Sequence, residues 1–351
     1  MKFQISKRFV SGRKLAKSSL SRVPLILLGL LTPVYVKLYS LSNIAIYEDF
    51  FISDQLTFVT SLHELPREFN RCSREHSKRA ALHSWSHEFS RTIILADNDG
   101  ICDALKEMDL VNMHCIVHDC IYSNHTVPSV RCLLIQTERL VGDGGAVMFS
   151  NSDLIYKNTT LALQMARKKF NDFILVGKRL DTDFRKVCDS NLPFMKKKGD
   201  KLLTSPRFSR RLVENAILHN EYGIDYFIFT KGSLPLHMMP DFLIGAWKWD
   251  NWLLDTVVRK SNVPLIDTTE VVQAVHLQTT KGTHHDRIGT EWNKDEYMRF
   301  YRLKDSMHLL NDPYPVGYGS IKYTPFLMNG SAMIANKQCY SDLPSRKMIE
   351  C

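Results

Sequence analysis

The sequence predicts an α/β fold in which a mostly parallel sheet is flanked by helices, preceded by a membrane anchor. Short apolar runs of strand length alternate with amphipathic stretches of helix length between residues 55 and 276. The composition, 44% hydrophobic and 24% charged over 351 residues, is that of a globular protein with a large core. Basic residues precede one long apolar run near the N-terminus.

The N-terminal region predicts a signal anchor. Residues 1–22 contain seven Lys and Arg and no acidic residue, and the apolar run 23–41 is long enough to span a bilayer if Lys37 snorkels. The positive charge before the run places the N-terminus in the cytosol. We therefore expect a tail at 1–22, an anchor at 23–41, a stem at 42–54 and a luminal domain at 55–351. A cleaved signal peptide and a mitochondrial transit peptide remain alternatives.

The net charge of +9 is concentrated at the N-terminus. Eight of the 46 Lys and Arg residues precede Glu48, which is the first acidic residue. The remainder of the chain is therefore almost neutral. The sequence shows no basic face and no nucleic-acid-binding motif, so a nucleic-acid partner is excluded.

The first half of the globular region predicts alternating strands and helices. The predicted strands are 55–61, 92–96 and 114–117, and the predicted helices between them are 74–89 and 101–108. This βαβαβ order is typical of a parallel sheet.

The second half continues the alternation. A strand at 146–149 breaks at 150–153 and resumes at 154–156. Further strands are predicted at 173–177, 225–230, 263–267 and 271–276, with helices at 159–170, 205–222 and 252–260. Residues 278–295 are polar and irregular, which predicts a mobile loop.

Cysteines and glycosylation sequons suit a luminal domain. The chain has eight cysteines, an even number that is compatible with disulfides in an oxidising compartment, although buried free thiols are an equal alternative. Asn124, Asn158 and Asn329 begin sequons for N-glycosylation.

Polar residues follow several of the buried runs, where parallel sheets bind ligands. These residues are Thr60 and Ser61, Asp97 to Asp99, Asn151 to Asp153, and His276. In an extended chain Asn151 and Asp153 point the same way, and their oxygens suit a hard divalent cation that also binds a diphosphate. A polar turn capped by Asp153 is the alternative. Asp97/Asp99 and Asp181/Asp183 are rival D-x-D pairs.

Several segments resemble a nucleotide-diphospho-sugar transferase family, over roughly residues 58–278. They are AVMFSNSDLI at 146–155, FILVGKRLD at 173–181, DYFIF at 225–229, MPDFLIG at 239–245, WDNWL at 249–253, PLIDTTEVV at 264–272 and VHLQ at 275–278. The resemblance implies the GT-A glycosyltransferase fold, which has a Rossmann-like sheet.

The resemblance also implies roles for individual residues. Asn151 and Asp153 occupy the D-x-D position, His276 the remaining metal ligand, and Asp250 the acceptor-side carboxylate. The implied cofactor is a divalent cation, Mn or Mg. Asn151 departs from a strict D-x-D motif, which lowers the expected dependence on metal.

The implied function is transfer of a sugar from a nucleotide-sugar donor to a glycan or glycoprotein acceptor, in the Golgi or endoplasmic reticulum. The metal, with Lys178 or Arg179, would neutralise the diphosphate, and Asp250 would be the general base. Asp250 as a helix N-cap is the alternative. The residues expected to bind the donor are Thr60, Ser61, Asp97, Asn151 and Arg179. Trp247, Trp249 and Trp252 either stack on sugars or belong to the core. A nucleotidyl- or phosphotransferase and a non-catalytic binding module remain alternatives.

Overall fold

The structure, a computed structural model, describes residues 55–65, 72–121, 126–190, 206–246, 248–279, 287–302, 321, 326–329 and 332–335. The chain divides into two compact units, Met1–Phe50 and Phe51–Cys351, and the first lies outside these residues. The predicted tail, anchor and stem therefore lie outside them too. None of the helices within the described ranges is long and apolar enough to cross a membrane.

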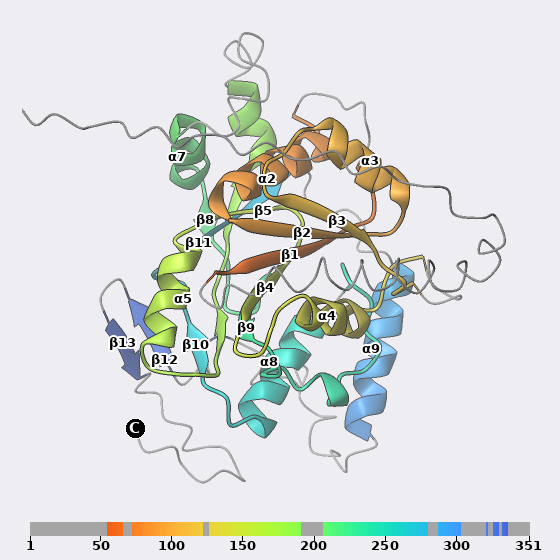
Figure 1. Ribbon diagram of the computed structural model, residues 1–351, viewed down its shortest axis with the longest axis vertical. Helices are drawn as coiled ribbons and strands as arrows, with labels where there is room; N and C mark the ends of the chain where they lie inside the picture. Colours follow the sequence, from red (N-terminus) through yellow and green to blue (C-terminus); the bar gives the residue numbers. More distant parts are fainter. Residues whose placement is uncertain are drawn as a thin grey trace, which may run out of the picture. The chain divides into compact units, whose positions relative to one another are not determined.

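A nine-stranded sheet forms the centre of the described unit (Figure 1). Its order is β13-β12-β10-β6-β9-β4-β1-β2-β3. Every neighbouring pair is parallel except those made by β9 and β13, which run antiparallel to their neighbours. The strands are β1 (Thr57–Leu62), β2 (Arg91–Ala96), β3 (Met113–Val117), β4 (Ala146–Ser150), β6 (Ile174–Val176), β9 (Tyr226–Thr230), β10 (Leu265–Asp267), β12 (Phe326–Asn329) and β13 (Ala332–Ala335).

The predicted βαβαβ unit is confirmed in β1, α2 (Arg74–Glu88), β2, α3 (Asp99–Glu107) and β3. Both helices begin at side-chain caps. Ser73 accepts a hydrogen bond from the backbone N–H of His76, and Asn98 accepts one from that of Ile101. The Asn98 cap makes α3 begin at Asp99, two residues before the predicted start at 101.

A second sheet has four strands in the order β5-β11-β7-β8. They are β5 (Leu154–Lys157), β11 (Gln273–Gln278), β7 (Leu180–Asp183) and β8 (Ile217–Leu218). The predicted break at 150–153 is the point where the chain leaves the large sheet and enters this one. Residues 181–183, which contain a rival D-x-D pair, form most of β7 and are held by pairing with β11 and β8.

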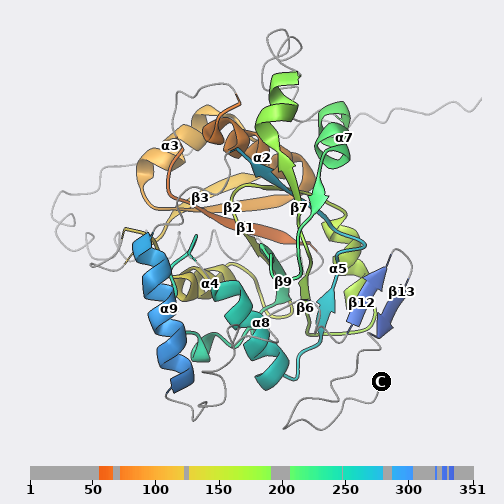
Figure 2. The same cartoon turned by 180° about the vertical axis from the view of Figure 1, so that it is seen from behind.

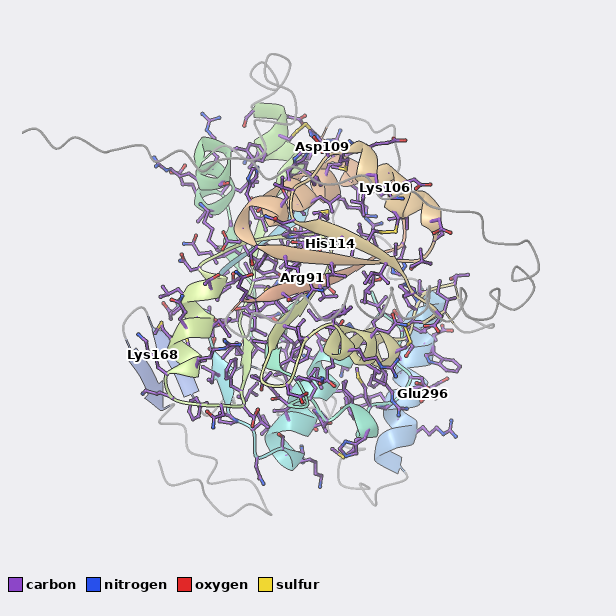
Figure 3. The ribbon with its side chains drawn as sticks, viewed as in Figure 1. Arg91, Lys106, Asp109, His114, Lys168 and Glu296 are labelled. Carbon is purple, nitrogen blue, oxygen red and sulfur yellow. A yellow bond between two sulfur atoms is a disulfide. The ribbon has the colours of Figure 1, made fainter. Side chains whose placement is uncertain are left out.

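Side chains of the large sheet alternate between two apolar layers. Helices cover both faces of this sheet (Figures 1 and 2). Phe58 packs with α2, α3, α5 (Thr159–Arg167) and the small sheet. Val59 packs on the opposite face with α4 (Val130–Arg139), α8 (Trp249–Lys260) and α9 (Arg287–Arg302). Charged residues such as Lys106, Asp109 and Lys168 lie at the periphery (Figure 3).

Two predicted segments require correction, and several elements were not predicted. Helix α7 (Pro206–Glu214) ends before 222, because the chain turns into β8. The predicted loop at 278–295 contains the start of α9, which is polar and is held by few contacts, such as the side-chain amide of Asn293 on the backbone of Leu243. Helix α4 was not predicted, and neither were the 3₁₀ turn η3 (Leu236–Met238), β12 and β13.

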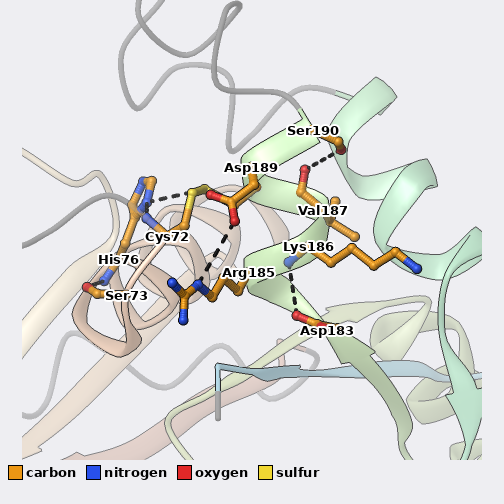
Figure 4. The surroundings of a disulfide bond; sticks show 10 residues. Cys72, Ser73, His76, Asp183, Arg185, Lys186, Val187, Asp189 and Ser190 are labelled. Atoms are coloured by element: carbon orange, nitrogen blue, oxygen red, sulfur yellow. Dashed lines mark hydrogen bonds and ion pairs between the residues drawn. A yellow bond between two sulfur atoms is a disulfide. The ribbon is translucent and has the colours of Figure 1, made fainter.

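Six of the eight cysteines form disulfides, so the alternative prediction of buried free thiols is wrong for these six. The pairs are Cys72–Cys188, Cys102–Cys115 and Cys120–Cys132. Cys72–Cys188 joins the start of α2 to the helical residues 184–190, beside the ring of His76 (Figure 4). Cys339 and Cys351 lie outside the described residues.

The structure places one sequon fully. Asn158 is exposed immediately before α5, and its side-chain amide donates to the carbonyl of Val271 at 3.2 Å. Asn124 lies outside the described residues, and Asn329 lies on β12 with its side chain outside them. Glycosylation at all three stays a prediction.

Candidate functional site

A row of polar residues lines one edge of the large sheet. It lies at the carboxyl ends of the parallel strands, where open α/β sheets bind ligands. Because β9 runs antiparallel, the residue before its start lies at this edge as well. In strand order from β3 to β10 the row is His118, Asp97, His63, Asn151, Asp225, Arg179 and Asp267.

Asp181, on β7 of the small sheet, accepts hydrogen bonds from one guanidinium and two imidazoles. His276 Nδ1 lies 3.0 Å from Oδ1, Arg179 Nε lies 2.8 Å from the same oxygen, and His219 Nδ1 lies 2.5 Å from Oδ2. We call His219, Asp181 and His276 the Asp181 cluster. The other ring nitrogen of His276, Nε2, lies 3.1 Å from Oδ2 of Asp153.

Arg179 connects this cluster to the large sheet. Its Nη1 donates to Oδ2 of Asp225, whose Oδ1 accepts from the amide nitrogen of Asn151 at 2.6 Å. Asn151 and Asp153 thus have different partners, and the expectation that they share one extended face is wrong because residues 151–153 form a turn. The structure nevertheless includes both in one network with His276 and Arg179.

The network fixes the charges of its members. Burial alone would lower the pKa of His276, but hydrogen bonds to Asp153 and Asp181 raise that pKa to about 9. Burial would raise the pKa of Asp153, yet the bond to His276 holds it below its usual value. The pKa of Asp181 is likewise held well below its usual value, against burial, by His276, Arg179 and His219. At neutral pH both carboxylates are ionised and His276 is charged.

A divalent cation at Asp153 and His276 stays a prediction, and it would have to displace the Nε2 proton of the charged His276. The facing atoms of these two residues are 3.1 Å apart, and the Asp153 side chain is 39% exposed. Asp181 holds the far nitrogen of His276, which is the usual arrangement behind a metal-ligating histidine. Two protein ligands would leave positions for diphosphate oxygens and water, as Mg²⁺ prefers. Asn151 turns its amide nitrogen to Asp225, so its side chain is less suited to ligation.

Asp250 lies in the first turn of α8, half-buried. Burial and the nearby charge of Asp225 raise the pKa of Asp250 to about 7, against backbone N–H bonds and Arg179. The N-cap position belongs to Lys248, which makes no side-chain cap, whereas the carboxyl group of Asp250 accepts from backbone N–H groups of the first turn, so the capping alternative stays open.

The tryptophans around Asp250 belong to the core where the structure describes them. Trp252 is fully buried against Phe242, and Trp249 packs against Phe227. Stacking on sugars is therefore wrong for these two. Trp247 lies outside the described residues.

A second carboxylate between two imidazoles lies at the other end of the row. Asp97 Oδ2 accepts from His63 Nδ1 at 2.7 Å, and Oδ1 lies 2.8 Å from His118 Nε2. We call these three residues the Asp97 cluster. Burial would raise the pKa of Asp97, but the two histidines lower it to about 2. The backbone N–H of Cys120 donates to Nδ1 of His118, which therefore carries its proton on Nε2.

The remaining residues expected at the donor lie inside β1. Thr60 is fully buried and its hydroxyl donates to the carbonyl of Ser150 at 2.7 Å. Ser61 is buried too, and its hydroxyl has no hydrogen-bond partner among the residues that the structure describes. Donor binding by Thr60, Ser61, Asp97, Asn151 and Arg179 stays a prediction.

Four residues of the site were not predicted from the sequence. His63 and His118 each directly follow a strand, so the rule that selected Asp97 applies to them equally. Asp225 precedes a strand and required knowledge that β9 is antiparallel. His219 follows β8, a two-residue strand without a clear apolar pattern.

No family model matches this chain, and no curated protein matches it. Among solved structures it is similar to a 4-diphosphocytidyl-2C-methyl-D-erythritol synthase from Anaerococcus prevotii and to HddC from Yersinia pseudotuberculosis. Each similarity covers 70% of this chain and 99% of the other, at TM-score 0.34, with 9% and 10% identity respectively. A putative glucose-1-phosphate thymidylyltransferase from Bacillus anthracis is similar over 36% of this chain and 55% of its own, at TM-score 0.27 and 10% identity. At these scores the likeness does not extend to function. The fold itself is mixed α/β, with a mostly parallel sheet flanked by helices.

Proposed function

We propose that this chain is a metal-assisted glycosyltransferase that moves a sugar from a nucleotide-diphosphate donor to a hydroxyl of a glycan or protein. The observation that carries the proposal is the position of Asp250. A carboxyl group with a pKa near neutrality adjoins the network that contains the Asp153–His276 pair. Glycosyl transfer needs both a base for the acceptor and positive charge for the departing diphosphate.

Asp153 and His276 would hold the cation and Arg179 lies close to them. A bound divalent cation would supply electrostatic stabilisation of the charge that develops on the diphosphate. Arg179 is already paired with Asp181 and Asp225, so its position is fixed before the donor arrives. Preorganised charge of this kind is an effective way to lower a barrier.

Asp250 would take the proton of the acceptor hydroxyl. A base with a pKa close to the working pH is both available in ionised form and basic enough to act. Asp225 sustains this pKa because its own carboxylate is bound by Arg179 and Asn151, next to Asp250.

The same feature favours sugar transfer over nucleotidyl transfer to a phosphate. A phosphate oxygen is ionised at neutral pH and attacks without a base, whereas a sugar hydroxyl requires one. The raised pKa of Asp250 is therefore useful in sugar transfer to a hydroxyl and not in nucleotidyl transfer to a phosphate.

The proposal includes a location in the lumen of the secretory pathway. The three disulfides support it, because disulfides persist in oxidising compartments and are rare in the cytosol. A panel of nucleotide sugars tests the reaction itself. Release of a nucleoside diphosphate supports glycosyl transfer. Release of a sugar 1-phosphate, with the nucleoside monophosphate moved to the acceptor, supports nucleotidyl transfer. Donor binding without turnover supports a binding module.

The substitution Asp250→Asn tests the base. Transfer should fall on the order of a hundredfold or more. The wild-type rate should rise as pH passes through about 7, and the variant should lose that rise.

Asp250→Asn also tests the raised pKa through stability. The pKa of Asp250 is higher in the folded chain than its unfolded value of about 3.9, so ionisation destabilises the fold increasingly between pH 4 and 7. The variant should therefore melt above the wild type at pH 8 and match it at pH 4. The control is Asp103→Asn on the exposed side of α3, which should change neither property. Full transfer by a folded Asp250→Asn protein would remove Asp250 from the mechanism.

A further inference from the structure

Residues 217–223 connect the Asp181 cluster to the start of α8. Ile217 pairs with Asp181 across the small sheet, and the backbone N–H of His219 donates to the carbonyl of Arg179 at 2.9 Å. At the other end, the side-chain amide of Asn251 donates to the carbonyl of Tyr222 at 3.1 Å. Asn251 directly follows Asp250, so this segment adjoins both the charged network and the proposed base.

The segment presents an imidazole in a fixed orientation. A carboxylate oxygen of Asp181 lies 2.5 Å from Nδ1 of His219, so Nδ1 donates to it and Nε2, on the other side of the ring, is directed away from Asp181. The His219 side chain is 28% exposed. A Cβ at position 223 would lie 2.0 Å from the ring, so Gly223 is what allows the ring to occupy this place.

Exposed apolar residues precede and follow His219 in the sequence. Eight large hydrophobic side chains are exposed among the described residues, and three of them fall within residues 217–222. Ile217 is 76% exposed, Leu218 47% and Tyr222 41%. Tyr222 follows His219 by three residues, and exposed aromatic rings and oriented hydrogen-bonding groups are both features of binding sites.

We propose that the 217–223 segment binds the acceptor and that the acceptor is a carbohydrate. This inference rests on the proposed function and assigns the acceptor side of the same site. A pyranose has an apolar C–H face, which suits the Tyr222 ring, and hydroxyls at its rim, one of which would donate to Nε2 of His219. A second hydroxyl would then be directed to Asp250, on the helix that Asn251 links to Tyr222.

The experiment measures binding of 4-nitrophenyl hexosides and of UDP and GDP to the full-length chain. Tyr222→Ala and His219→Ala should each weaken the hexoside about tenfold, and Tyr222→Phe should retain affinity within about twofold. Nucleoside diphosphate binding should not change in any of them. Leu161→Ser is the control, because Leu161 is comparably exposed but lies on α5.

Transfer assays separate the acceptor from the donor. Tyr222→Ala should raise the KM for the acceptor about tenfold, with kcat and the KM for the donor unchanged. This inference is overturned if hexosides bind the wild type and the Tyr222 and His219 variants with equal affinity, or if they bind none of these proteins. Either result leaves the proposed function standing. Hexoside binding that is lost in these variants, without nucleotide binding or turnover in the wild type, supports the segment and refutes the proposed function. Because Tyr222 is on the surface, its substitution tests the segment even if His219→Ala fails to fold.

Discussion

Asp97 and Asp181 each hold two imidazole rings, but the two clusters have different surroundings. In the Asp97 cluster the bonds end at the two histidines, and the backbone N–H of Cys120 fixes His118 from behind. In the Asp181 cluster the same arrangement continues through Arg179 to Asp225 and through His276 to Asp153. The first cluster lies at the edge of one sheet, whereas the second joins two sheets.

The two clusters differ in the number of carboxylates and in their exposure to solvent, which decides whether a cation can bind. Each carboxylate oxygen of Asp97 faces one imidazole, and among the described residues these two histidines contact no further charged side chain. Around Asp181, three carboxylates share one guanidinium and one charged His276, and Asp153 remains partly exposed. An excess of carboxylate that is open to solvent can accept a cation, so we expect the proposed cation at the Asp181 cluster rather than at the Asp97 cluster.

The largest expected effect compares His276→Ala with His118→Ala. Loss of His276 removes half of the proposed cation site, and transfer should fall on the order of a hundredfold or more. His118→Ala should keep transfer within about threefold. Rates are measured below the melting temperature of both variants, checked by circular dichroism. Equal losses in the two variants would mean that the clusters share one role.

Asp181→Asn should cause the next largest effect, on stability. It leaves Arg179, His219 and His276 without their common carboxylate, and breaking a buried charge pair costs about 3 kcal/mol. Thermal melting should fall by about 6–12 °C. A drop below about 2 °C would show that the network contributes little to joining the two sheets.

Asp97→Asn should cost less, about 1–2 kcal/mol, since it affects two imidazoles and no guanidinium. The pKa of Asp97 is about 2 in the folded chain and about 3.9 unfolded, so its contribution is present above pH 4 and is lost as pH falls through 2. Urea unfolding should show a constant gap between wild type and variant from pH 5 to 7, narrowing towards pH 3. A gap that does not narrow would contradict the assigned ionisation.

The smallest effects are expected for His63→Gln and His219→Gln. Glutamine can still donate to the carboxylate and both rings are partly exposed, so each should cost less than about 1 kcal/mol of unfolding free energy. Matched melting curves check this. If His63→Gln matched Asp97→Asn in cost, the Asp97 cluster would depend on its exposed ring rather than on the buried His118.

Much of the fold follows from periodicity in the sequence. The strands around Phe58, Ile94 and Met148 are apolar on both faces, and the helix beginning at Arg74 is capped by Ser73, so local signals and packing agree. Strand direction is not a local signal. Asp225 was missed because nothing in the residues 226–230 states that β9 is reversed.

The site was partly predictable for the same reason. Asp153 and His276 were selected as polar residues after apolar runs, and the structure places them 3.1 Å apart. Asp181 was considered only as a rival motif, because its strand is polar and short. Its role depends on pairing with β11, which brings it to His276 from 95 residues away.

The Cys72–Cys188 bond has a consequence for how this protein can be produced. The two cysteines are 116 residues apart, and the bond removes chain freedom from the unfolded state. Loop-closure estimates put a bridge of this span at about 4–5 kcal/mol, a large share of the roughly 5–15 kcal/mol that keeps a typical domain folded. A bacterial cytosol keeps thiols reduced, so we expect poor yields of folded chain there. A secreting host is the better source, and thiol reductants should be kept out of the purification buffers.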